Sequence, residues 1–184
     1  MINKKIWLSS DYHFCHNKPF LYEPRGFNNV WDMNKDIIEK HNSCVNMIDD
    51  VYILGDLMLN NNEEGIKCIK QLKGSLHIIL GNHCTDTRIE LYKTCYNVVE
   101  IVYATRLNYK GYHFYLSHYP TFCSNFDDNK SLKSKTINLC GHSHITDPFG
   151  DWNRGVIYHV EVDAHNCYPV CLDQIISDLN KKIN

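Results

Sequence analysis

The first half of the chain alternates between short apolar runs and stretches with helical periodicity. Three apolar runs predict strands, and the segments between them carry apolar residues at the spacing of one helix face. In chain order these are a strand at Ile6–Ser10, a helix at Asp32–Ile48, a strand at Val51–Leu54, a helix at Glu63–Leu72 and a strand at Leu76–Leu80. This βαβαβ opening is typical of an α/β protein.

The second half is richer in strands and ends in a helix. Strands are predicted at Asn97–Tyr103, Thr105–Tyr109, Tyr112–Ser117, Thr136–Cys140 and Val156–Val162, and a helix at Leu172–Ile183. We expect an α/β fold of two sheets packed together, with helices outside. No repeat, low-complexity tract or linker divides the sequence, so residues 1–184 are expected to form a single domain.

Side chains of the kinds that bind metals follow five of these strands directly. The five blocks are Asp11-Tyr12-His13, Gly55-Asp56, Gly81-Asn82-His83, His118 and Gly141-His142-Ser143-His144. Ligand sites of α/β sheets lie just beyond the carboxyl ends of the strands, so these loops are expected to converge on one edge. The glycines before Asp56, Asn82 and His142 fit a backbone that must approach a metal closely.

The chemistry of these residue types favours a pair of divalent cations. Two ions about 3.5–4 Å apart need roughly four protein ligands each, with a carboxylate that bridges them. Mixed oxygen and imidazole ligands suit manganese, iron, zinc or nickel and argue against a thiolate zinc site. The nine cysteines form no CxxC pair and are expected to be reduced, mostly buried thiols of a cytoplasmic protein.

These five blocks, in this order, resemble the signature of the calcineurin-like metallophosphoesterases. The resemblance extends over nearly the whole chain and is greatest to a compact bacterial and phage branch of that family. The further matching stretches are Asp11–His16, Arg25–Phe27, Leu72–Gly74, His118–Pro120, Val162–Asn166 and Pro169-Val170. The family's fold is a two-sheet α/β/β/α sandwich with helices on the outer faces, which agrees with the pattern of elements above.

The resemblance also implies roles for individual residues. Two divalent ions are implied, and manganese is the first expectation for both. One ion is assigned to Asp11, His13 and His144. The other is assigned to Asn82, His118 and His142, with Asp56 bridging both. A hydroxide between the ions is expected to attack phosphorus in line with the leaving group. His83 is expected to give the leaving group a proton.

One position departs from the family's pattern. The family commonly has an acidic residue after the Gly-Asn-His triplet, and this chain has Cys84. We expect the metals still to bind, because that carboxylate is better placed to support the ligands than to be one. Its loss would alter how His83 is oriented or protonated, which would favour activated esters over alkyl esters.

Two further residues are candidates for contact with the substrate. His16 either faces the phosphate or the first metal, or only solvates its loop. Arg25 either pairs with a phosphate oxygen, which its planar guanidinium suits, or forms a surface salt bridge. The histidines within predicted helices and strands, His41, His77, His113 and His159, are expected to have structural roles.

Charge and hydropathy limit the partners of the chain. The formal net charge is −2 and no basic stripe is present, so no strong nucleic-acid-binding surface is expected. No signal-like or membrane-spanning segment is visible, which predicts a cytoplasmic protein without a membrane partner. The sequence carries no signal for an oligomeric state.

The predicted activity is hydrolysis of a phosphodiester of nucleotide type, or of another small and accessible phosphate ester. A phosphomonoesterase with the same site remains an alternative. A non-catalytic protein-binding scaffold on the same fold is a second alternative, although such scaffolds generally have eroded metal ligands. Metal content begins to separate these readings, because a scaffold need not bind two ions per chain.

Overall fold

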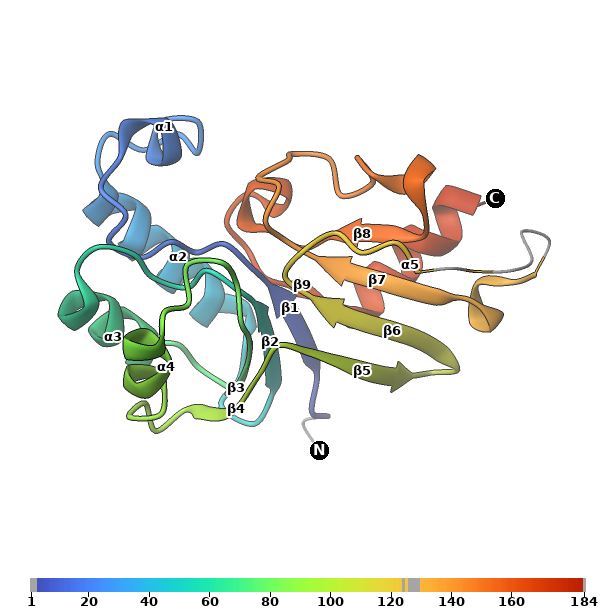
Figure 1. The fold of residues 1–184 in the computed structure, drawn as a ribbon, viewed down its shortest axis with the longest axis horizontal. Helices are drawn as coiled ribbons and strands as arrows, with labels where there is room; N and C mark the ends of the chain where they lie inside the picture. The colour runs from blue at the N-terminus through green and yellow to red at the C-terminus, as the bar shows by residue number, and fades with distance from the viewer. Residues whose placement is uncertain (1–2, 124, 126–129, 184) are drawn as a thin grey trace.

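The chain folds into two β-sheets that lie side by side with helices around them (Figure 1). This computed structural model describes residues 3–123, 125 and 130–183. The first sheet has the strand order β4-β3-β2-β1-β9, with β1 to β4 parallel and β9 antiparallel to β1. Its strands are β1 (Ile6–Ser9), β2 (Asp50–Leu54), β3 (Ser75–Ile79), β4 (Val98–Val102) and β9 (Val170–Cys171).

The second sheet has the strand order β5-β6-β7-β8. Its strands are β5 (Ala104–Tyr109), β6 (Tyr112–Ser117), β7 (Thr136–Cys140) and β8 (Ile157–His159). Strands β5 and β6 form an antiparallel hairpin, whereas β6, β7 and β8 are parallel. The hairpin turns at Lys110 and Gly111, whose φ angles are 50° and 80°. Two successive left-handed residues match the right-handed twist of a hairpin, as the predicted tight turn requires.

Five α-helices accompany the sheets: α1 (Pro19–Tyr22), α2 (Val30–Cys44), α3 (Asn62–Lys70), α4 (Asp86–Tyr92) and α5 (Leu172–Ile183). Two hydrophobic cores hold the layers together. The first joins the first sheet to α2 and α3, and it includes Met33, Ile37, Val51, Ile53 and Ile69. The second lies between the two sheets and against α5, and it includes Leu8, Leu54, Phe114, Leu139 and Ile175. The predicted α/β architecture of two sheets flanked by helices is confirmed.

The boundaries of α2 differ from the prediction of Asp32–Ile48. The helix begins earlier, because the Asn29 side chain accepts hydrogen bonds from the backbone N–H groups of Trp31 and Asp32 at 3.0 Å each. It ends at Cys44, and Val45 is extended. The Asp49 carboxylate then accepts from the backbone N–H of Asn46, which closes a turn where the apolar pattern suggested more helix.

Several short elements escaped the sequence patterns. Helix α4 buries only Tyr92 of its own residues, so it has no apolar stripe to detect. Strand β9 has two residues and exists only because they pair with Trp7 and Leu8 of β1. The predicted strand Val156–Val162 is reduced to β8, since the chain leaves the sheet to form a 3₁₀ turn at Val162–His165.

The topology brings the ends of several strands together. Strands β1, β2 and β3 are parallel, as are β6 and β7, and their carboxyl ends meet where the two sheets adjoin (Figure 1). The loops that follow these five strands therefore surround one place. Across the described residues, no helix combines the length and apolar character needed to span a bilayer.

Candidate metal centre

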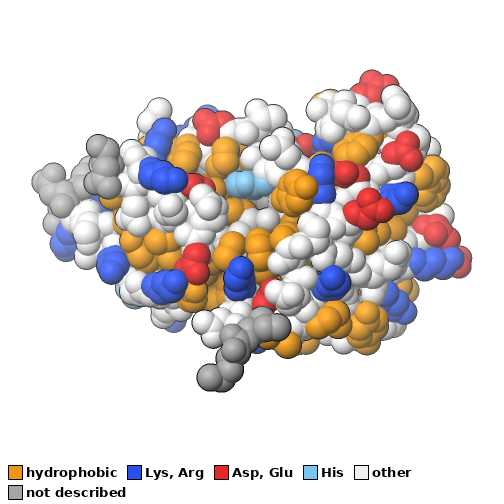
Figure 2. All heavy atoms as spheres, turned by 180° about the vertical axis from the view of Figure 1, so that it is seen from behind, with side chains coloured by type: hydrophobic (Ala, Val, Ile, Leu, Met, Phe, Trp, Pro, Cys, Tyr) orange, Lys and Arg blue, Asp and Glu red, His pale blue; other side chains and the backbone are white. Residues whose placement is uncertain are grey.

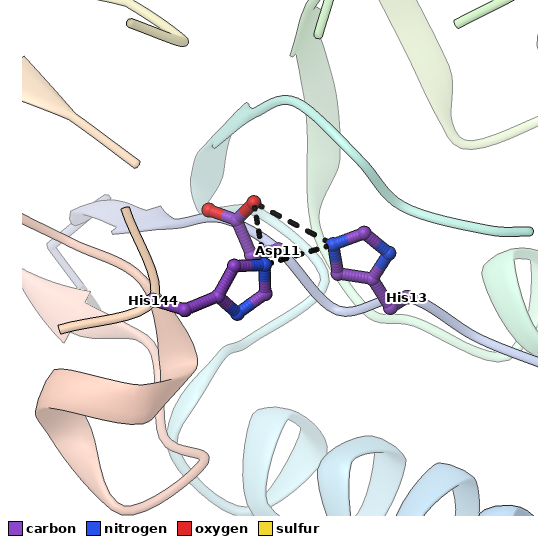
Figure 3. Close-up of side chains that lie close together, drawn as sticks. All are labelled: Asp11, His13 and His144. Carbon is purple, nitrogen blue, oxygen red and sulfur yellow. Dashed lines mark hydrogen bonds and ion pairs between the residues drawn. The ribbon is translucent and has the colours of Figure 1, made fainter. Parts of the chain in front are cut away.

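Three predicted ligands point toward one another in the loops after β1 and β7 (Figure 3). The Oδ1 atom of Asp11 lies 3.7 Å from Nε2 of His13 and 3.7 Å from Nε2 of His144. The two Nε2 atoms are 3.2 Å apart. This group can offer one carboxylate oxygen and two imidazole nitrogens to a single ion.

A second group of predicted ligands lies beside the first. The Oδ1 atom of Asn82 is 2.8 Å from Nε2 of His118 and 3.0 Å from Nδ1 of His142. These three residues follow β3, β6 and β7, so three separate strands contribute to one cluster.

Asp56 lies between the two groups. Its Oδ2 atom is 3.4 Å from Nε2 of His118 and 3.9 Å from Nε2 of His13. Oxygens of Asp11 and Asp56 also come together with His118 closely enough to share an ion. The structure thus brings all seven predicted ligands to one place, with Asp56 in the position of a bridge.

The backbone at this centre is unusual. Five of the seven residues have positive φ angles: Asp11 at 58°, His13 at 51°, Asp56 at 52°, His142 at 75° and His144 at 51°. This left-handed conformation costs about 1–2 kcal/mol per residue for side chains other than glycine. Strain of this kind clusters at functional sites, because it persists only where the surrounding structure enforces it.

The glycines that precede three of the ligands are required by space. A Cβ atom on Gly55 would overlap the imidazole of His118, and one on Gly81 would overlap the carboxylate of Asp56. A Cβ atom on Gly141 would overlap the side chains of Ser10 and Asp11. Close approach to a metal was predicted here, but the neighbours that exclude a Cβ atom are side chains that follow other strands, some of them in the other sheet.

Hydrogen bonds to the protein fix how several ligands present their atoms. The Nδ1 atom of His118 donates to the carbonyl of Leu54 at 2.8 Å, which leaves the lone pair of Nε2 facing the centre. The Oδ2 atom of Asp11 accepts from Ser10 Oγ at 2.6 Å and from the backbone N–H of His142 at 2.9 Å. Its Oδ1 atom is buried and has no hydrogen-bond partner.

This arrangement fits divalent cations. A buried carboxylate oxygen without a donor is costly, and a cation at that position would satisfy it. Burial raises the pKa of the Asp11 carboxyl, but His13 and His144 outweigh it and hold the pKa at about 2. Burial lowers the pKa of His13. An ionised carboxylate beside a neutral imidazole is the state in which both residues bind metals.

Asp163 and Arg25 support His144 on the side of its ring opposite to the proposed metal-binding nitrogen. The Nδ1 atom of His144 donates to Oδ2 of Asp163 at 3.0 Å. Asp163 in turn accepts two hydrogen bonds from Arg25, from Nε and Nη2, each at 2.8 Å. Burial acts to raise the pKa of Asp163, but His144 and Arg25 hold it well below its usual range. A carboxylate behind an imidazole ligand is a common way to set its tautomer and orientation.

Asp163 was given no role from the sequence. It directly follows the predicted strand Val156–Val162 and lies in the matching stretch Val162–Asn166, but neither signal was used. The side chain of Arg25 is only 2% exposed, so its salt bridge is buried rather than superficial. Its guanidinium also donates to the carbonyl of Asp11 at 2.9 Å. A phosphate would have to compete with these partners.

His16 lies beside the first group of ligands. Its ring centroid is 5.3 Å from that of His13. Burial, together with the nearby histidines, lowers the pKa of His16 to about 4, so its imidazole is neutral at physiological pH.

His83 stands at the edge of the centre, with its side chain 40% exposed and Nε2 at 4.0 Å from Oδ2 of Asp56. Its peptide is held on both sides. The backbone N–H donates to Oδ1 of Asp56 at 3.0 Å, and the carbonyl accepts from Nη1 of Arg88 at 2.6 Å. Arg88 was not predicted, because it lies in α4, which carries no apolar periodicity.

The thiol of Cys84 packs against the first core. Its Sγ atom accepts a hydrogen bond from the backbone N–H of Gly81 at 3.3 Å. Burial raises the pKa of this thiol, so it is neutral at physiological pH. The loop of His83 therefore has an arginine brace on its carbonyl and an uncharged side chain where the resemblance implies an acid.

Comparison of the sequence with known proteins finds a relative that matches nearly the whole chain. No family model matches the chain. The uncharacterized protein MJ1445 of Methanocaldococcus jannaschii is 33% identical over 187 residues, which covers 98% of this chain and 94% of that protein. The chain belongs to the same family as MJ1445.

Among solved structures, the protein of unknown function AQ665 from Aquifex aeolicus superposes with a TM-score of 0.72 at 20% identity, covering 95% of this chain and 99% of that one. It shares the fold. The phosphoesterase YfcE from E. coli gives a TM-score of 0.48 at 15% identity, covering 85% of this chain and 78% of that one.

Proposed function

We propose that this member of the MJ1445 family is a dinuclear-metal phosphoesterase that hydrolyses small phosphodiesters. One observation carries the proposal: two clusters of ligand atoms adjoin, and a single oxygen of Asp56 faces both, at 3.4 Å from His118 and 3.9 Å from His13. Paired ions that share a carboxylate are the arrangement that phosphoester hydrolysis uses most directly.

The donor set indicates which residues would hold each ion. Asp11, His13 and His144 would bind one, Asn82, His118 and His142 the other, and Asp56 both. Oxygen and imidazole donors suit manganese first, with iron, zinc or nickel as alternatives. Such ions supply Lewis acidity to the phosphate and activate water for attack.

His83 would protonate the leaving group. Its imidazole is exposed enough to meet a substrate, and its peptide is fixed by Asp56 and Arg88. In this role the Nε2–H would donate to the departing oxygen as the ester bond breaks. Because its backbone is held on both sides, the ring samples fewer positions than a side chain on a free loop would.

The engaged arginines favour a diester over a monoester. Arg25 donates to both oxygens of Asp163, and Arg88 donates to His83 and to Asn62. A phosphodiester carries one negative charge and a monoester up to two near neutral pH, so the diester needs less additional compensation. Every ligand position that the resemblance implies is filled and His83 is present, which argues against a scaffold with eroded ligands.

Hydrolysis of bis-p-nitrophenyl phosphate by chelator-stripped protein, with and without added Mn²⁺, tests the proposal. We expect activity that requires the metal and is lost in Asp56→Ala. Asp50→Ala is the matched control, because Asp50 is a carboxylate of β2, the strand that precedes Asp56, and it pairs with Lys4 and His77 instead of the ligands. Hydrolysis of p-nitrophenyl phosphate alone would indicate a monoesterase. No hydrolysis of either ester by protein that holds two metals would contradict the proposal.

A further inference from the structure

Two large aromatic side chains stand exposed next to different histidines of the cluster. Phe20 is 70% exposed and Tyr119 is 49% exposed. An exposed apolar residue is common on protein surfaces and by itself indicates nothing. These two rings are of interest because both lie close to the candidate metal centre.

Tyr119 adjoins the ligands of the Asn82 group. Its ring centroid lies 5.0 Å from that of His118 and 4.8 Å from that of His142, in edge-to-face geometry with interplanar angles of 69° and 66°. If a phosphate is bound at the centre, a substituent that extends from it toward His118 and His142 would contact this ring.

Phe20 lies near the other ligand group, which it reaches through His16. Its ring centroid lies 5.7 Å from that of His16 at an interplanar angle of 86°, and His16 is 5.3 Å from His13. Ring contacts thus lead from Phe20 through His16 to His13 of the Asp11 group, whereas Tyr119 contacts His118 and His142 of the Asn82 group. Each of the two ligand groups therefore has one exposed aromatic ring near it.

The backbone that carries each ring is held in place before any substrate arrives. The carbonyl of Tyr119 accepts hydrogen bonds from Ser117 Oγ at 2.8 Å and from Thr121 Oγ1 at 2.9 Å. Phe20 is in the first turn of α1, which begins at Pro19 and is anchored by the buried Leu21. Preformed aromatic surfaces bind planar groups at a low cost in conformational entropy.

The charge pattern limits the length of the substrate. Basic and acidic side chains are interspersed on the face shown in Figure 2, without a continuous basic stripe. The net charge of the chain is −2. Long nucleic acids are bound through many phosphate contacts to basic side chains, so this surface suits a short substrate.

We propose that Phe20 and Tyr119 are stacking platforms that select phosphodiesters with a planar aromatic group on each side of the phosphate, as in a dinucleotide. This inference rests on the proposed phosphodiesterase function and names its substrate class. Water adds to phosphorus, the bond to one ester oxygen breaks, and that oxygen leaves with a proton. A dinucleoside monophosphate would yield one nucleotide and one nucleoside.

The test compares two diesters with alkoxide leaving groups: thymidylyl-thymidine, which has two bases, and glycerophosphoethanolamine, which has none. We expect the wild-type protein with Mn²⁺ to prefer the dinucleotide in kcat/KM. Phe20→Leu and Tyr119→Leu should each lower kcat/KM for the dinucleotide about 5- to 100-fold, mainly through KM, because a stacked base contributes that much to binding. Hydrolysis of the aliphatic diester should fall much less than hydrolysis of the dinucleotide in both variants.

Two control variants separate stacking from other effects. Tyr119→Phe keeps the ring and should retain the preference. Tyr96→Leu removes an exposed aromatic whose hydroxyl bonds to Lys70, away from the ligands, and should change neither substrate. Equal losses on both diesters, or none, would overturn the stacking role. A wild-type preference for the aliphatic diester would overturn the substrate class while leaving the phosphoesterase intact. Inactivity on both and on bis-p-nitrophenyl phosphate would overturn both proposals.

Discussion

Arg88 donates a hydrogen bond of 2.6 Å from Nη1 to the backbone carbonyl of His83. Its Nε atom donates to Asn62 at 3.1 Å, so the first turn of α3 is tied through α4 to the loop that carries His83. Cys84, the residue after His83, supplies no charge to this loop, and the hydrogen bonds of Arg88 brace it instead. They fix the backbone of the proposed proton donor, and no pattern in the sequence indicated this support.

Loss of this brace should slow esters with poor leaving groups most. We expect Arg88→Met to lower kcat about tenfold for an alkyl phosphodiester and less than threefold for bis-p-nitrophenyl phosphate, because only the alkoxide needs a proton to depart. Arg88→Lys should fall between. In a His83→Ala background Arg88→Met should have no further effect, since the brace acts through His83. Equal losses on both esters, or additive losses in the double variant, would show that Arg88 is only structural.

Asp163→Asn should weaken the binding of one of the two ions. The substitution removes the charge that orients His144, and losses of a supporting carboxylate typically cost about 10- to 100-fold in metal affinity. It also leaves Arg25 buried without its ionic partner, so the free energy of unfolding should drop by about 3–5 kcal/mol. Calorimetric titration with Mn²⁺ at a temperature where the variant is folded measures the first effect. Unchanged affinity for both ions would contradict the role given to Asp163.

Gly81→Ala should damage the centre out of proportion to its size. The added methyl group would overlap the Asp56 carboxylate and push it from its place between the two ligand groups. We expect a loss of bound metal and of activity. Gly155→Ala is the control, since a Cβ atom there meets only ordinary contacts at 3.6–3.9 Å. Normal metal content in Gly81→Ala would show that Asp56 can move without consequence.

His41 should make the fold sensitive to acid. Its Nε2 atom donates to the carbonyl of Lys73, and Tyr12 donates to Nδ1 at 2.9 Å. Burial lowers the pKa of His41 to about 4. A histidine whose pKa is depressed by folding stabilises the protein fully above the pKa of the unfolded chain and loses that contribution as the pH falls toward 4.

We therefore expect the stability difference between wild type and His41→Gln to shrink by about 2–3 kcal/mol between pH 7 and pH 4. Urea denaturation of both proteins across this range measures it. A difference that stays constant with pH would mean that His41 titrates normally in the folded protein.

The seven candidate ligands were predictable because each follows an apolar strand, and parallel strands bring their carboxyl ends to one edge. Asp163 was overlooked although it directly follows the predicted strand Val156–Val162, whose last residue begins a 3₁₀ turn in the structure. Arg88 was not predictable, because it lies in a short helix that carries no periodic pattern. The same holds for β9, whose two residues become a strand only when β1 is beside them. The glycines before Asp56, Asn82 and His142 were predicted as sites where the backbone approaches a metal, and the structure shows that side chains approach them closely. That the approach is to ligand side chains depends on tertiary structure.

The number of ions bound per chain tests the dinuclear centre most directly. Protein loaded with Mn²⁺ and then desalted can be measured by inductively coupled plasma mass spectrometry, beside Asp56→Ala and Asp50→Ala shown by circular dichroism to be folded. The account predicts two ions per chain in the wild type and in Asp50→Ala, and at most one in Asp56→Ala. A folded wild type that holds one ion or none, or an Asp56→Ala variant that keeps two, would contradict it.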